Sequence, residues 1–104
     1  MRCGLDLDEL IEYWTLVGEE LERARGKRGV NAPAFALLLK FVIHFGRFPR
    51  GRSELPAEVV EFVARQVQVA PGELGFYEWS GRSIERHRAE IRELLDYREC
   101  SLAD

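Results

Sequence analysis

The sequence predicts an all-α domain, a compact bundle of five or six short helices. Apolar residues recur with helical spacing along most of the chain, and glycine and proline divide it into short segments. The valine-rich run at 59–67 has no second strand-like run with which it could pair. With 104 residues, of which 46% are hydrophobic, the chain suits one core. We therefore treat residues 1–104 as a single domain.

The first two helices are predicted from their acidic starts. Asp6 and Asp8 precede an apolar stripe, which suits the first turn of a helix. The stripe consists of Leu10, Ile11 and Trp14. Thr15 is the expected cap of the second helix, which has glutamates in its opening turns and arginines near its end. Gly26 is expected to end that helix.

The third helix is predicted to be the central one. Asn31 is a natural cap, and Pro33 suits a first helical turn. Only Lys40 and His44, four residues apart, form a polar ridge on this helix, and Gly46 is expected to end it. Its apolar residues are Phe35, Leu37, Leu38, Leu39, Phe41, Val42, Ile43 and Phe45. The helix should therefore be buried on most sides, and we expect most aromatic residues, Phe45 included, in the core.

The second half of the chain predicts two further helices. One spans about 53–68 and turns its valines and Phe62 inward. The aromatic segment 71–79 is expected to contain about one helical turn. The last helix spans about 82–96, with Ile84, Ile91 and two leucines on one face.

Charge is segregated along the chain. Residues 1–22 carry one base and seven acids, residues 23–52 carry eight bases and no acid, and residues 53–104 carry six bases and eleven acids. The net charge of -3 therefore conceals a basic middle segment. Polyanions respond to the local field rather than to the total charge, so this segment is expected to attract nucleic acid.

Signatures of catalysis and of metal binding are missing from the sequence. It contains none of the GxSxG, GxGxxG, HExxH or P-loop motifs. His44 and His87 are the only histidines, and Cys3 and Cys100 lack the spacing of a zinc site. We expect no enzyme activity, no metal and no cofactor. Without a signal peptide or a long apolar run, the expected location is the cytoplasm, in association with the nucleoid.

The start of the last helix carries candidate base-reading residues. At 100° per residue, Arg82 and Arg86 project together from the side opposite the apolar face. Recognition helices contact base edges mainly through N-terminal residues, and arginine can bind guanine with two hydrogen bonds. This pattern singles out Arg82, Ser83 and Arg86. Glutamates interleave with these arginines, however, and composition alone favours an ordinary solvated helix.

Other basic residues are candidates for phosphate binding. Two glycine-rich loops and one flank of the last helix contribute them, and loops of this kind can offer backbone N–H groups and guanidinium groups to phosphates. Plain solubility explains the loops equally well. The candidates are Arg25, Lys27, Arg28, Arg47, Arg50, Arg52 and Arg88.

Several blocks of the sequence, taken together, resemble a known family. The blocks are 31–49 with Phe35-Ala36-Leu37 and Gly46-Arg47-Phe48-Pro49, then 59–66, Trp79-Ser80-Gly81-Arg82-Ser83 and 87–93. In order and spacing they resemble the N-terminal domain of Tn3-family replicative transposases. The resemblance covers nearly the whole chain.

The resemblance implies a module that binds double-stranded DNA at the terminal inverted repeats of a transposon, through helix-turn-helix-like units. By position, the turn at 79–82 and the following helix would face DNA, and the loop at 46–52 would lie beside phosphate. The family's catalytic triad and magnesium site match nothing here, so the catalytic part of a transposase is an expected partner. The residues alone leave another hypothesis open, a helical protein-interaction or regulatory module that docks charged partners or forms a homodimer.

Overall fold

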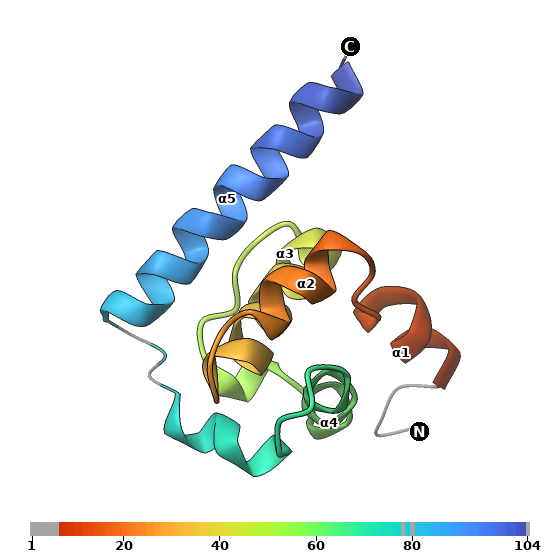
Figure 1. Cartoon of the computed structure of the whole chain (residues 1–104). Helices are drawn as coiled ribbons and strands as arrows, with labels where there is room; N and C mark the ends of the chain where they lie inside the picture. Colours follow the sequence, from red (N-terminus) through yellow and green to blue (C-terminus); the bar gives the residue numbers. More distant parts are fainter. Residues whose placement is uncertain (1–6, 78, 80, 104) are drawn as a thin grey trace.

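The computed structural model describes residues 7–77, 79 and 81–103, and within them it contains helices and no strand (Figure 1). The predicted all-α class is confirmed. Five α-helices alternate with two short 3₁₀ helices. In chain order the elements are α1 (Leu7–Trp14), α2 (Glu19–Arg25), α3 (Asn31–Phe45), η1 (Arg52–Glu54), α4 (Ala57–Gln66), η2 (Pro71–Phe76) and α5 (Arg82–Ala103).

Helix α3 lies at the centre of the fold. Ten consecutive residues, 32–41, are buried, and α1, α2, α4 and α5 all contact this helix. Gly46 ends α3 as expected, with φ of 80° and its N–H donated to the carbonyl of Val42 at 2.8 Å. This left-handed conformation suits glycine because it has no Cβ.

The predicted polar ridge of α3 is wrong at Lys40. Its side chain is buried, and Nζ lies 3.1 Å from Oε1 of Glu20 on α2. Helix α2 covers this side of α3, and a charge removed from water needs a partner. His44, the second residue of the ridge, is exposed.

The link between α1 and α2 also differs from expectation. Thr15 caps nothing, because α2 begins only at Glu19, with Gly18 before it at φ of 49°. The extended link is held instead by Gln66 of α4. The N–H of Leu16 donates to Oε1 of Gln66 at 2.7 Å, and Nε2 of Gln66 donates to the carbonyl of Trp14 at 2.9 Å.

The second half of the chain follows the prediction with two changes. The helix expected over 53–68 is divided, because Pro56 is extended and separates η1 from α4. The expected turn within 71–79 is η2. Helix α5 continues past the predicted end at 96 to Ala103, since no glycine or proline interrupts it. Its C-terminal half projects beyond the other helices (Figure 1).

The C-terminal end of α3 is more exposed than expected. Phe45, predicted to be a core residue, is 54% exposed. Its ring lies 4.3 Å from that of His44, which is in turn 4.2 Å from the ring of Tyr13 on α1. Helical spacing alone therefore predicted burial for Phe45 wrongly.

Candidate nucleic-acid interface

The start of α5 presents the three predicted base-reading residues. Gly81, at φ of 101°, precedes the helix, and its carbonyl accepts the N–H of Glu85 at 3.2 Å. Arg82, Ser83 and Arg86 are exposed, whereas Ile84 is buried. No carboxylate of the described chain pairs with either arginine. The structure therefore places all three side chains on the accessible side of one helical start.

His87 anchors this part of α5 to the core. It is buried, its Nδ1 lies 2.8 Å from the Tyr77 hydroxyl, and its ring meets the Phe35 ring edge-on at 5.8 Å. Burial, followed by the nearby charge of Lys27, lowers the pKa of His87. Burial also raises the pKa of Tyr77 to about 12. The imidazole therefore has a structural role, which the sequence alone did not assign to it.

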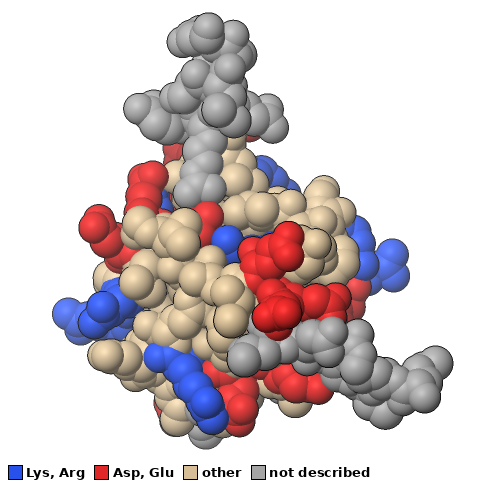
Figure 2. Space-filling view, turned by 90° about the vertical axis from the view of Figure 1, so that its right-hand side faces the viewer, with Lys and Arg blue, Asp and Glu red and all other residues tan. Residues whose placement is uncertain are grey.

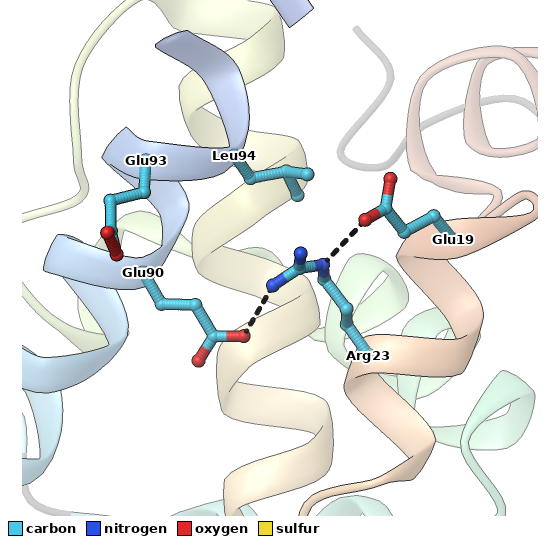
Figure 3. Close-up of a pocket in the computed structure, with 5 residues that line it drawn as sticks. All are labelled: Glu19, Arg23, Glu90, Glu93 and Leu94. Atoms are coloured by element: carbon cyan, nitrogen blue, oxygen red, sulfur yellow. Dashed lines mark hydrogen bonds and ion pairs between the residues drawn. The ribbon is translucent and has the colours of Figure 1, made fainter. Parts of the chain in front are cut away.

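The first basic loop is partly neutralised by α5. Lys27 Nζ lies 2.8 Å from Oε1 of Glu90, and Arg23 Nη1 lies 3.2 Å from Oε2 of the same carboxylate. Arg23 also pairs with Glu19 at 3.0 Å (Figure 3). Burial raises the pKa of Glu90, but the hydrogen bonds from Lys27 and Arg23 outweigh it and leave that pKa below its usual value. The segment 23–52 contains no acidic residue, but in the folded chain several of its bases lie next to carboxylates from other segments.

A hollow of about 400 Å³ lies beside these ion pairs, between α2 and α5 (Figure 3). Its lining residues are Glu19, Arg23, Glu90, Glu93 and Leu94. Three carboxylates surround one guanidinium, so the hollow is unsuited to a phosphate. The cations of this loop that remain available are Arg25 and Arg28, which are exposed and pair with no described carboxylate.

The second basic loop follows α3 and folds back onto η1. Arg47 donates to both carboxylate oxygens of Glu54, at 2.6 and 3.2 Å, and the backbone N–H of Arg50 donates to the same carboxylate. The bonds from Arg47, followed by that from Arg50, lower the pKa of Glu54 to about 2. The Arg50 side chain is exposed, whereas that of Arg52 lies outside the part of the chain that the structure describes.

Arg88 brings α5 and the second loop together. Its Cζ lies 5.5 Å from the centre of the Phe48 ring, and Cζ of Arg92 lies 5.2 Å from the same centre. Helix α5 therefore has Lys27 on one flank and the loop of Phe48 on the other. Sequence reasoning missed Arg92 as a member of this group, although its i, i+4 spacing from Arg88 was a usable signal.

Acidic side chains also gather on the side of the molecule that carries α1. Figure 2 views the molecule from the side on which α1 lies, and there acidic residues gather near the middle while basic residues lie mainly toward the edges. Helix α1 itself carries acids in its first turn and no base in its last. The candidate interface is the start of α5, where Arg82 and Arg86 are exposed, with Glu85 exposed in the same turn.

The described residues lack the features of two other kinds of site. They contain no group of three or more histidine, cysteine, aspartate or glutamate side chains placed to hold a metal ion. No helix among them combines the length and the apolar character needed to cross a membrane.

Comparisons with known proteins agree with the resemblance seen in the sequence. A family model described as "Domain of unknown function (DUF4158)" matches residues 4–104. The transposase for transposon Tn501 of Pseudomonas aeruginosa is 33% identical over 98 residues, which are 93% of this chain and 10% of that protein. The chain thus spans about a tenth of the length of the curated relative it matches. No solved structure matches it. The chain belongs to the DUF4158 family, and its predicted kinship with the N-terminal domain of Tn3-family transposases is confirmed.

Proposed function

We propose that this chain is a DNA-binding module of a transposase, which recognises the terminal inverted repeats of a transposon and does not cut them. The observation that carries the proposal is the start of α5, where Arg82 and Arg86 are exposed and lack a carboxylate partner among the described residues. Similarity to a transposase supports it. The catalytic part of a transposase is the expected protein partner, in the cytoplasm at the nucleoid.

In this function the start of α5 reads bases. An α-helix fits the major groove of B-DNA, and its first residues reach the base edges. Arg82 and Arg86 are separated by one helical turn and can each offer a guanidinium fork to a guanine. Ser83, exposed between them, can donate or accept a hydrogen bond. Together with the preceding elements, α5 would form a helix-turn-helix-like unit on duplex DNA.

The remaining candidates hold phosphates. The contacts that each side chain makes in the folded chain indicate how available it is to a phosphate. Arg25 and Arg28 have exposed side chains without a described carboxylate partner, whereas the exposed Arg50 lies near Glu54, and its charge helps to lower the pKa of that carboxyl. Lys27 and Arg47 are paired with Glu90 and Glu54, so they bind phosphate only in competition with those carboxylates. The full set is Arg25, Lys27, Arg28, Arg47, Arg50, Arg52 and Arg88.

Two substitutions separate base reading from phosphate binding. Arg86→Ala should cost about 1–3 kcal/mol at one base position and relax specificity there, whereas Arg50→Ala should weaken all sequences alike and lower the salt slope by about one unit. The measurement is a titration with transposon-end and scrambled duplexes at two salt concentrations. Arg65→Ala is the control, because Arg65 lies on α4 and pairs with Glu61 at 3.5 Å. If Arg86→Ala changed affinity, specificity and salt slope in the same way as Arg50→Ala, the base-reading role of Arg86 would be refuted.

A protein-interaction module is the second candidate function, and one observation favours it. The exposed large apolar side chains of the described chain all belong to α1, the link after it and the end of α3. They are Ile11, Tyr13, Val17, Ile43 and Phe45. Light scattering combined with an electrophoretic shift on short duplexes separates the two functions. A dimer that is indifferent to DNA would favour the interaction module.

A further inference from the structure

Two arginines of α5 converge on a single ring of the second basic loop. Arg88 and Arg92 are one helical turn apart, and the Cζ atoms of both lie within 5.5 Å of the centre of the Phe48 ring. We call these three residues the Phe48 cluster. Within the described chain neither guanidinium has a carboxylate partner. The neighbouring cations Lys27 and Arg47 each have one.

The cluster holds more positive charge than its surroundings compensate. Like charges at i and i+4 of a helix repel each other. Arg88 is half-buried, and its Nε is a buried donor without a hydrogen-bond partner. Attraction to the face of an aromatic ring offsets part of this cost but supplies no counter-charge. The free protein therefore keeps two guanidinium groups in place, and an external anion would stabilise both.

The geometry also favours tight and specific binding of an anion. Contact with Phe48 restricts the rotamers of both side chains before any ligand arrives, so less conformational entropy is lost on binding. Arg92 is exposed, which leaves its N–H groups accessible. Guanidinium groups match the oxygens of phosphate with paired hydrogen bonds, which a lysine in the same place would not.

We propose that the Phe48 cluster is an anion site that binds phosphodiester groups of a nucleic-acid backbone, with Phe48 as the positioning residue. This inference deepens the proposed function and rests on it for the source of the phosphate. Arg92 lies six residues after Arg86, about 9 Å along the helix axis. At 100° per residue Arg92 is also turned about 120° from Arg86, so the cluster lies on the flank of α5 and would meet the backbone of a duplex beside the base-reading face.

The first test is the salt dependence of DNA binding. Arg88→Gln and Arg92→Gln should each lower the slope of log K against log salt by about one unit, since each loses a phosphate contact. Arg65→Gln removes the same charge from α4 and should leave the slope nearly unchanged. Phe48→Leu keeps every charge but frees both arginines, and it should weaken binding to transposon-end and scrambled duplexes alike. Slopes for Arg88→Gln and Arg92→Gln equal to that of Arg65→Gln would overturn the proposal.

The second test needs no DNA. Inorganic pyrophosphate should raise the melting temperature of the unaltered chain, and it should raise that of Arg92→Gln and Phe48→Leu much less. Because Arg92 is exposed, its replacement is expected to leave the fold intact. A pyrophosphate effect that is equally large in Arg92→Gln would overturn the anion site.

The two tests distinguish failure of the site from failure of the proposed function. If pyrophosphate protects through Arg92 but no duplex binds, the anion site is supported and the DNA-binding function is refuted. If duplexes bind and Arg88→Gln and Arg92→Gln behave as Arg65→Gln does, the function is supported and the phosphate role of the Phe48 cluster is refuted.

Discussion

Glu90 decides how much of the first basic loop can reach an anion. Its carboxylate binds Lys27 at 2.8 Å and Arg23 at 3.2 Å, and both contacts help to hold its pKa below the usual value. It is therefore ionised at neutral pH. In the proposed function, phosphate and Glu90 would compete for the same cations, so this one side chain should reduce the affinity of the domain for polyanions.

Glu90→Gln should strengthen binding to every duplex and make its salt dependence steeper. The substitution removes one negative charge from α5 and releases Lys27 and Arg23 for phosphate. The ion pairs are partly exposed, so the loss of stability should be about 1 kcal/mol or less. The measurement is a titration at several salt concentrations, with Glu61→Gln on α4 as the control. Identical affinities for both variants would contradict a special role for Glu90.

At the scale of elements, Gln66 joins α4 to the extended link between α1 and α2. Its side-chain amide satisfies one backbone donor and one backbone acceptor of that link. No regular structure is present there to satisfy them, and buried backbone groups without partners are costly. Gln66 therefore fixes the position of α1, although it lies 50 residues from Leu16 in the sequence.

Gln66→Leu should destabilise the domain by about 1–3 kcal/mol, because two part-buried backbone groups lose their partners. Chemical denaturation measures the change, and hydrogen exchange should show the Leu16 amide losing protection. Gln68→Asn is the matched control, because Gln68 is exposed and asparagine tolerates its positive φ of 61°. An unchanged free energy of unfolding in Gln66→Leu would show that water replaces the amide without loss.

The elements differ in how well local sequence predicted them. Helix α3 and its end at Gly46 were predicted, because apolar spacing and glycine act within a few residues. The start of α2 and the burial of Lys40 were not, because Gln66 and Glu20 act on them through tertiary contacts. The same limit applies to the candidate site. Helical spacing placed Arg82 and Arg86 on one face, but it could not show that Glu90 and Glu54 would meet Lys27 and Arg47.

Positive and negative charges are less completely separated in the folded molecule than along the sequence. The segment 23–52 has no acid of its own, yet folding supplies carboxylates to several of its bases from α2, η1 and α5. The positive charge without a described carboxylate partner lies on Arg25 and Arg28 of the first loop, at the start of α5 and around Phe48. In the proposed function, recognition of a polyanion would depend on the folded arrangement of α5 and the two loops, and it should be lost when the domain unfolds.

The stability of the whole domain should depend on pH through His87. Burial lowers the pKa of this imidazole below its usual 6.5, and its charged neighbours Lys27, Glu90 and Arg86 modify the shift, while Tyr77 contacts the ring. The folded state therefore binds the proton less readily than the unfolded state. The contribution is complete above about pH 6.5 and is lost as pH falls through the lower, folded-state pKa.

The free energy of unfolding should accordingly decrease below about pH 6.5, by at most about 1.4 kcal/mol per pH unit for this one group. Denaturation between pH 5 and 8, a range of about three units in which histidine titrates, measures the effect. His87→Gln should flatten the curve in this range. If the free energy of unfolding of His87→Gln depended on pH as steeply as that of the unaltered chain, the effect would come from other groups.

The rings around His87 give the domain an intrinsic optical probe. Trp79 lies 4.9 Å from Tyr77, whose hydroxyl contacts His87 on α5. The indole fluorescence of Trp79 therefore depends on how α5 is seated. Trp14, the other tryptophan, lies next to His44 at the end of α3, so a Trp14→Phe chain would emit from Trp79 alone. A ligand that displaces α5 would then change the emission spectrum of Trp79, and no added label would be needed to detect it.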